Sequence, residues 1–230
     1  MQSIAQEHLR SATVGTSDGA DEIACRGSGI EANGKLPISA FIICKDEEAA
    51  IRNCLRSVSS FAEIVVVDSY STDNTIGIIE ELIKEGLPIK LFQRQWPGYA
   101  DQKQFALDQC SAEWCLNLDA DERVDTKMLA MLPSLVSDKA RIVGWRFTRR
   151  PFLPGYGYAK GKRPQRRNLR LIRNGFGAYD VTAKVHEGIR PNGPVKDCKS
   201  GAILHYTPTL IGDQILQENK YSTLKAEMIV

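Results

Sequence analysis

The stretch EIVVVDSYSTDNT, residues 63–75, indicates the fold of this chain. It opens with a continuous run of apolar, mostly β-branched residues and reaches a carboxylate at Asp68. A run without polar alternation is typical of a parallel strand that is covered on both faces. A polar loop follows Asp68, and an apolar helical periodicity begins after the loop. The stretch therefore predicts a strand–loop–helix unit of an α/β sheet.

The flanking sequence repeats this alternation of strands and helices. We expect Asp46 to cap the helix that follows the first strand. Alternation of this kind favours a doubly wound, mostly parallel sheet in a single Rossmann-like domain. The predicted strands are 38–44, 63–67, 88–92, 114–118, 141–148, 167–173, 181–186 and 200–206, and the predicted helical segments are 51–58, 78–83, 102–110 and 126–136.

Composition limits the class of protein. With 43% hydrophobic residues and a net charge of +2 in 230 residues, the chain is not disordered over its whole length. It contains no run of about 18 apolar residues, so no transmembrane helix is predicted. We expect residues 1–35 to be a flexible leader, residues 36–208 to be the globular domain and residues 209–230 to be a C-terminal helix. This helix reaches Val230 without a cap, so we expect the natural chain to continue.

The cysteines and the charges suggest a compartment and a partner. The six cysteines include no C-x-x-C pair, and we interpret them as reduced core residues of a reducing, cytoplasmic compartment. Residues 141–173 hold nine arginines and two lysines but no acidic residue. Such a block indicates either an anionic partner or a solvated basic face. No nucleic-acid-binding motif is present, so we do not expect nucleic acid as the partner.

Acidic residues follow three of the predicted strands. Cys44-Lys45, Asp68 and Asp119-Ala-Asp121 stand at strand ends. In open parallel sheets, ligands bind beyond these ends, so we expect the groups to share one crevice. Asp119 and Asp121 are suited to binding Mg²⁺ or Mn²⁺, with a solvated loop as the alternative.

The remaining candidates each carry two interpretations. Asp68 could hydrogen-bond a nucleotide or simply close a turn, and Asp73 could be a ligand or a helix cap. His186 and His205 could bind a metal or be structural. Glu187 becomes a candidate general base if it is partly desolvated.

Taken together, these segments resemble the family 2 glycosyltransferases with the GT-A fold, and in particular the bacterial lipopolysaccharide-core glucosyltransferase branch. The resemblance covers about residues 36–226. The blocks that carry it are FIICKDEEAAIRNCLRSV (41–58), EIVVVDSYSTDNT (63–75), WPGYADQKQFAL (96–107), WCLNLDADERV (114–124), RLIRNG (170–175), VHE (185–187) and LHY (204–206).

The resemblance implies an inverting transfer of a sugar, glucose in this branch, from a UDP-sugar to a hydroxyl of a lipopolysaccharide-core or other cell-envelope glycan. It also implies a cytoplasmic enzyme that is peripheral at the inner face of the membrane. The implied nucleotide-sugar-binding residues are Lys45, Glu47, Asp68, Asp73, Lys103, Asp119, Arg170 and Arg173; Asp68 would hold the uracil, and the two arginines would face the diphosphate or the acceptor.

The family pattern further implies a divalent metal, Mg²⁺ or Mn²⁺, bound by Asp121 with Asp119 and His205. Glu187 occupies the position of the catalytic base. The local motif is His-Glu where Glu-Asp is usual, which leaves His186 as the alternative base. The Gly-rich loop 154–163 is expected to close over the donor and exclude water.

Three other functions stay open at this point. A polyprenyl-phosphate glycosyltransferase would suit the basic block. A metal-dependent nucleotidyltransferase would use the same carboxylates but release pyrophosphate. A non-catalytic fragment that only binds sugar nucleotides would explain the uncapped C-terminal end.

Overall fold

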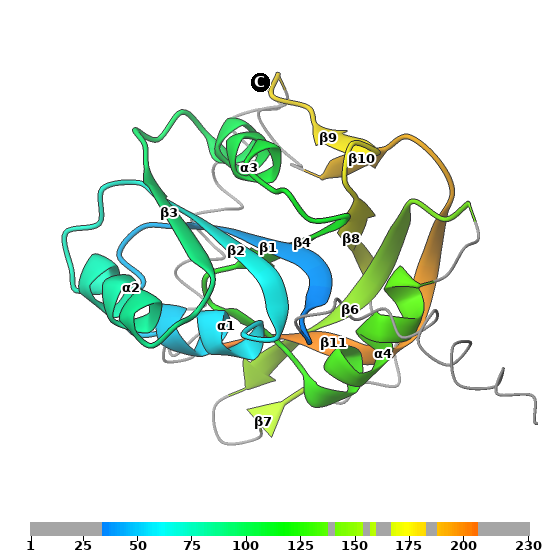
Figure 1. Ribbon diagram of the computed structural model, residues 1–230, viewed down its shortest axis with the longest axis horizontal. Helices are drawn as coiled ribbons and strands as arrows, with labels where there is room; N and C mark the ends of the chain where they lie inside the picture. The colour runs from blue at the N-terminus through cyan, green and yellow to red at the C-terminus, as the bar shows by residue number, and fades with distance from the viewer. Residues whose placement is uncertain (1–33, 138–140, 154–156, 160–166, 183–187, 207–230) are drawn as a thin grey trace, which may run out of the picture.

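The computed structural model describes residues 34–137, 141–153, 157–159, 167–182 and 188–206 (Figure 1). Most of the expected leader, the expected C-terminal helix and most of the Gly-rich loop 154–163 lie outside these residues. His186 and Glu187 also lie outside them. The described residues form a nine-stranded sheet and a separate two-stranded sheet.

The first half of the large sheet is parallel. Its strands are ordered β3-β2-β1-β4, and α1, α2 and α3 connect them along the chain. This arrangement confirms the predicted α/β alternation and the doubly wound, mostly parallel sheet. The elements are β1 (Leu36–Cys44), α1 (Ile51–Ser57), β2 (Phe61–Asp68), α2 (Thr75–Lys84), β3 (Ile89–Gln93), α3 (Tyr99–Asp108) and β4 (Trp114–Asp119).

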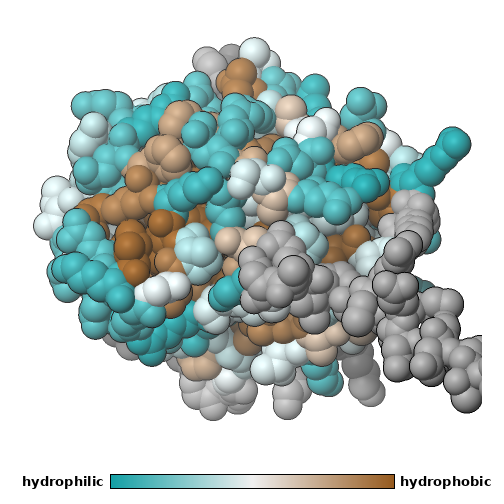
Figure 2. All heavy atoms as spheres, in the orientation of Figure 1, coloured by the Kyte–Doolittle hydropathy of each residue, from teal (hydrophilic) through white to brown (hydrophobic). Residues whose placement is uncertain are grey.

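Both faces of this half are covered, as the unbroken apolar runs predicted. On β2, Ile64 and Val66 pack into the core cluster of α1, α2 and α4 (Thr126–Val136), whereas Val65 and Val67 pack into the cluster of α3. Figure 1 shows α1, α2 and α4 on one side of the sheet and α3 on the other. Apolar side chains remain visible in Figure 2 over the edge of the sheet at β3, within a largely hydrophilic surface.

The second half of the sheet is mixed. It continues from β4 in the order β8-β6-β11-β5, and β8 runs antiparallel to both β4 and β6. The strands are β5 (Glu122–Val124), β6 (Gly144–Leu153), β8 (Arg167–Arg173) and β11 (Val195–His205), with β7 (Gly157–Tyr158) paired to β6. The small sheet consists of β9 (Gly177–Tyr179) and β10 (Ile189–Pro191).

The short strand β5 is an element that the sequence did not predict. It forms because Glu122 pairs with His205 in an antiparallel register with β11. A three-residue strand is too short to show a periodicity, so only its partner reveals it. This pairing brings the C-terminal end of β11 beside the turn that follows β4.

A close approach between β11 and α4 fixes the path of β11. Gly201 has φ +78°, and a Cβ atom there would lie 2.5 Å from the backbone of Met128. Only glycine fits a left-handed conformation pressed against another backbone at this distance. Gly201 therefore allows β11 to pass α4 and to carry His205 to the end of β4.

The described cysteines lie in the core, as expected. Cys44, Cys54, Cys110, Cys115 and Cys198 are all buried free thiols. Burial, together with the nearby carboxylate of Glu122, raises the pKa of Cys54. Such thiols are inert packing residues. In the described part of the chain, the helices are too short or too polar for any of them to span a bilayer.

Candidate functional site

The register of the parallel strands brings the predicted strand-end carboxylates to one edge. Cys44, the last residue of β1, pairs with Asp68 on one side, and its neighbour Ile43 pairs with Asp119 on the other. Neighbouring strands lie about 4.8 Å apart, so about 10 Å separates the backbones of Asp68 and Asp119. Lys45 is exposed directly beyond the end of β1.

The loops that follow β1 and β2 bind each other. The backbone N–H of Glu48 donates to Asp73 at 3.0 Å, and Glu48 in turn accepts from the N–H of Asn74 at 2.9 Å. Asp46 accepts from the N–H of Thr72 at 2.7 Å. These contacts hold the two loops in one conformation before any ligand arrives.

The expectation that Asp46 caps the first helix is wrong. α1 begins at Ile51 after Ala50, which makes no side-chain cap. Asp46 instead adopts a left-handed conformation with φ +54° and turns its carboxylate to the opposite loop. The carboxylate of Asp46 does accept a hydrogen bond from a backbone N–H group, as a capping residue does. That N–H group, however, lies 26 residues away.

Asp68 and Asp73 are both engaged within these loops. Asp68 is fully buried and accepts from the N–H of Ser71 at 3.0 Å and from Gln93 at 3.2 Å. Asp73 accepts from the N–H of Thr75 at 2.9 Å, the first residue of α2, which is a capping contact. Desolvation would raise the pKa of Asp73, but hydrogen bonds from Thr75 and the backbone outweigh it and lower the pKa.

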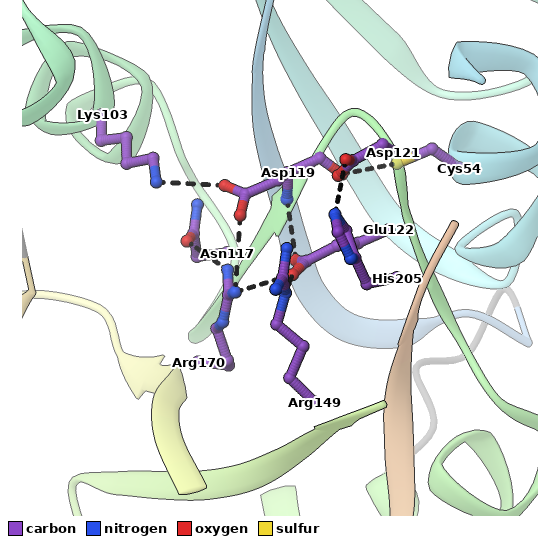
Figure 3. Close-up of polar contacts among 9 residues, drawn as sticks. All are labelled: Cys54, Lys103, Asn117, Asp119, Asp121, Glu122, Arg149, Arg170 and His205. Carbon is purple, nitrogen blue, oxygen red and sulfur yellow. Dashed lines mark hydrogen bonds and ion pairs between the residues drawn. The ribbon is translucent and has the colours of Figure 1, made fainter. Parts of the chain in front are cut away.

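Beyond β4, one group of charges is fully paired (Figure 3). Asp119 accepts from Lys103 at 3.0 Å and lies 3.5 Å from Arg170, which also donates to Asn117 at 2.9 Å. Burial alone would raise the pKa of Asp119, but the two cations hold it well below its usual range. Arg170 is itself only 8% exposed.

Glu122 closes the turn that contains Asp119 and Asp121. Its side chain is fully buried, and it accepts from the backbone N–H of Asp119 at 3.0 Å. It also accepts from Arg170 at 2.8 Å and from Arg149 at 2.6 Å. We refer to Lys103, Asn117, Asp119, Glu122, Arg149 and Arg170 as the paired half of the site.

Three members of this half were difficult to recognise from sequence. Glu122, Asn117 and Arg149 were not singled out as site residues. A polar asparagine inside the apolar strand WCLNLD was the one available signal. Arg149 comes from β6, and no local pattern connects it to β4.

Asp121 has a different environment from Asp119. Its carboxylate lies 2.8 Å from Nε2 of His205, and its backbone carbonyl accepts from the N–H of Tyr206 at 2.9 Å. Among the residues that the structure describes, no lysine or arginine forms an ion pair with Asp121. Asp121 and His205, which were predicted to bind one metal and are 84 residues apart, therefore lie in direct contact.

Glu47 completes an acidic group around Asp121. Burial, and then the negative charges of Asp121, Asp73 and Asp119, raise the pKa of Glu47 from 4.5 to about 7. Burial and nearby negative charge both disfavour the ionised form of a carboxyl. We refer to Glu47, Asp121 and His205 as the acidic half of the site.

A cavity of about 470 Å³ opens on the other side of Asp119. Its walls come from α3, β4, β6 and β8, from Tyr179, Ile189 and Pro191 of the two-stranded sheet, and from Gly188 directly before β10. In its described part, the basic block therefore does not form a simple solvated face. Arg170 and Arg149 pair with Glu122, while Arg146 and Arg167 line this cavity.

Arg173 is not brought to the site. It pairs in register with Trp114, at the opposite end of β4 from Asp119, and forms a 2.6 Å ion pair with Glu113. β8 is antiparallel to β4, so moving three residues from Arg170 to Arg173 leads away from the carboxyl edge. The register, which no local pattern encodes, separates these two arginines.

The donor atoms for a metal are few. In the described ranges, no three His, Cys, Asp or Glu residues are grouped closely enough to hold a metal ion by themselves. The acidic half nevertheless offers a carboxylate and an imidazole in contact. Two protein ligands leave most coordination positions of a divalent cation to water and phosphate oxygens.

Comparison with known proteins gives concordant results. Residues 39–185 match the glycosyl transferase family 2 domain. The lipopolysaccharide core biosynthesis glycosyltransferase LpsC of Rhizobium meliloti is 54% identical over 196 residues, which are 85% of this chain and 73% of that protein.

Two solved structures share the fold. The S. aureus TarS fragment 1–349 in complex with UDP superposes with a TM-score of 0.57 at 17% identity, over 74% of this chain and 60% of that one. GalNAc-T7 with UDP, GalNAc and Mn²⁺ gives a TM-score of 0.56 at 16% identity, over 74% of this chain and 44% of that one. These likenesses establish the GT-A fold, as expected from the sequence.

Proposed function

The chain belongs to glycosyl transferase family 2, and on this premise we propose that it transfers glucose from UDP-glucose, with inversion and with a divalent metal, to a hydroxyl of a lipopolysaccharide-core or other cell-envelope glycan. The observation that carries the proposal is the acidic half of the site. Among the described residues, no lysine or arginine pairs with the two carboxylates there, which lie directly beside a fully paired third one. The 54% identical relative named for lipopolysaccharide core biosynthesis supports the acceptor class.

The acidic half fits a bound Mg²⁺ or Mn²⁺. Asp121 and His205 supply an oxygen and a nitrogen in contact, and their side chains are only 26% and 17% exposed. Such mixed ligands suit Mn²⁺ in particular. When bound there, the ion would stabilise the negative charge that develops on the departing diphosphate. Asp119, held by Lys103 and Arg170, would face the ribose beside it.

The nucleotide would lie against the loops that follow β1 and β2, which are hydrogen-bonded to each other. Lys45, Glu47 and Asp73 border this place, and the buried Asp68 holds the second loop from behind through Ser71. A loop that is already ordered loses little conformational entropy on binding. We therefore assign Asp68 an indirect part in nucleotide binding, through the shape of residues 69–74.

Glu187 is the proposed base. It directly precedes Gly188, which lines the cavity. Its carboxylate would accept the proton of the acceptor hydroxyl while that oxygen attacks the anomeric carbon. The bond from the anomeric carbon to the diphosphate oxygen breaks on the opposite face, so the configuration inverts.

The base assignment predicts that Glu187→Gln lowers turnover about 10²–10⁴-fold, because a positioned base contributes that much. The affinity for UDP, measured by calorimetry, stays within about twofold, since the base touches only the acceptor. His186→Gln is the matched control. A larger loss of turnover in His186→Gln than in Glu187→Gln would reassign the base.

The donor is tested by the melting temperature of the full chain with a panel of nucleotide sugars, each with and without Mn²⁺. We expect UDP-glucose to raise the melting temperature most, and only with the metal. Nuclear magnetic resonance of the product then reports its anomeric configuration. No shift with any nucleotide sugar would contradict the proposal, and transfer to a polyprenyl phosphate but to no glycan would select the alternative acceptor.

We place the reaction at the cytoplasmic face of the cell membrane, as a peripheral enzyme. The five described cysteines are free thiols, as is usual in a reducing compartment. The cations of residues 141–173 would favour an anionic acceptor or lipid surface.

A further inference from the structure

We propose that the cavity beside Asp119 binds a negatively charged group, a carboxylate or a phosphate, carried by the acceptor sugar, and that Arg146 and Arg167 select it. This inference rests on the proposed function, because it assigns the acceptor end of the same site. The charge of the cavity, its unmet hydrogen-bond donors and its position each support it.

The cavity contains more positive charge than its walls neutralise. Lys103 and Arg170 are taken up by the carboxylates of the paired half. Arg146 and Arg167 share a single carboxylate, that of Asp197 on β11, at 3.7 and 3.3 Å. Asp197 is 42% exposed, so solvent screens this contact. Two guanidinium groups with one acid between them keep a net positive charge and most of their N–H donors.

Two donors beside the cavity have no acceptor within the described part of the protein. They are Nε of Arg167 and Nδ2 of Asn117, and both are buried. The orientation of the Asn117 amide is fixed, because its oxygen accepts from Arg170 at 2.9 Å. The unpaired nitrogen is therefore turned away from Arg170 (Figure 3), on a residue that is 4% exposed and lines the cavity.

Buried donors without acceptors are rare in native proteins and call for an explanation. Both lie on residues that line the cavity, so a ligand rich in oxygen atoms would satisfy them once the side chains that cover them shift. Arginine is well suited to such a ligand, since its planar fork matches a carboxylate or a phosphate with two parallel hydrogen bonds. The chemistry of the walls thus points to an oxyanion rather than to a neutral sugar alone.

The position of the cavity favours the acceptor over the diphosphate of the donor. Neither Asp121 nor His205 lines it, so the proposed metal lies on the other side of Asp119. Arg146 lies on β6, two strands and therefore about 10 Å from β4. Gly188, which follows the proposed base in the sequence, lines the same cavity.

Binding of small sugars by the full chain tests the proposal. Glucose 6-phosphate, glucuronate and glucose are titrated by calorimetry in the presence of UDP and Mn²⁺. We expect both anionic sugars to bind at least tenfold more tightly than glucose. The double variant Arg146→Gln/Arg167→Gln should lose this preference and bind UDP within twofold of the wild type. Comparing the two anionic sugars distinguishes a phosphate from a carboxylate.

Two further variants keep the result interpretable. Arg56→Gln removes one exposed arginine on α1, away from the cavity, and should leave every affinity unchanged. Arg146→Lys/Arg167→Lys keeps the charge and should retain part of the preference, which separates recognition from a loss of folding.

Two outcomes would overturn the inference. One is equal affinity for glucose and the anionic sugars in the wild type. The other is a loss of UDP affinity in the double variant that is as large as its loss of sugar affinity. That result would mean that the cavity binds the diphosphate of the donor. If no UDP-sugar binds while anionic sugars still bind through these arginines, the proposed function fails and the anion site stands.

Discussion

Asp119 and Asp121 are two residues apart, yet they belong to halves of the site with opposite electrostatics. In the paired half, Asp119 and Glu122 are matched by Lys103, Arg149 and Arg170. In the acidic half, Asp121 has His205, and Glu47 forms no ion pair with a lysine or arginine among the residues that the structure describes.

This difference indicates that the paired half is structural and that the acidic half binds a ligand. In the paired half the protein supplies its own cations, which lower the pKa of Asp119, whereas burial raises the pKa of Glu122. In the acidic half the pKa of Glu47 is raised to about 7, which shows that ionisation there is opposed. The missing positive charge is what a ligand would bring. Four variants test this division.

The largest effect is expected from Asp121→Asn. Removing a carboxylate that holds the metal should lower transfer about 10²–10³-fold and abolish the effect of Mn²⁺ on donor binding, while the fold persists. Steady-state kinetics and calorimetry with and without Mn²⁺ measure it. Asp108→Asn, an exposed position on α3, is the control. Undiminished activity in Asp121→Asn would remove the metal from the acidic half.

Glu122→Ala tests the paired half. The change leaves the buried Arg170 without its closest carboxylate and should cost about 3–5 kcal/mol of unfolding free energy. Glu113→Ala is the control, since Glu113, directly before β4, pairs with Arg173 of the same strand β8 but at the surface. That exposed pair should be worth less than about 1 kcal/mol. If urea denaturation shows equal losses of unfolding free energy in the two variants, Glu122 stabilises the fold no more than a surface ion pair does.

Glu47→Gln tests the acidic half through pH. Because the folded-state pKa of Glu47 is raised from 4.5 to about 7, the unfolded chain ionises this carboxyl first. Its stabilising contribution is full below pH 4.5 and is lost as the pH rises through 7. The variant avoids that loss, so its melting temperature should exceed that of the wild type by a few degrees at pH 8 and match it at pH 4.5.

Glu80→Gln, at an exposed position on α2, serves as the control for that pH dependence. If Glu47→Gln raises the melting temperature by the same amount at both pH values, burial and the neighbouring negative charges do not raise the pKa of Glu47.

The smallest effect is expected from Arg173→Gln. Arg173 lies at the far end of β4 and 41% of its side chain is exposed, so transfer should stay within about twofold of the wild type. Arg170→Gln, in contrast, should lose both stability and activity. A strong loss of donor affinity in Arg173→Gln would restore the diphosphate role that the family resemblance implied for it.

The parallel half of the fold was predictable because its signals are local. The run EIVVVD and the run FIIC contain enough apolar residues to identify buried strands, and the helices between them show their own periodicity. Parallel strands joined by helices must end at the same edge. The convergence of Asp68 and Asp119 follows from that geometry.

Other features depended on pairings that no local pattern encodes. Asp46 was expected to cap its own helix, but it satisfies an N–H group of the neighbouring loop. β5 exists only as the partner of β11. Arg170 and Arg173 looked equivalent in RLIR, and the antiparallel register of β8 assigns one to the site and the other to the surface.

The sequence alone therefore determined the α/β class, the strand ends and the carboxylates that stand at them, because each depends on residues within a few positions. The tertiary structure decided which carboxylates are neutralised, since Arg149, Arg170 and His205 reach the turn after β4 from strands far along the chain. Electrostatic interactions act through space over a few ångströms. The same acidic residue becomes a scaffold or a ligand according to the partners that folding brings within that distance.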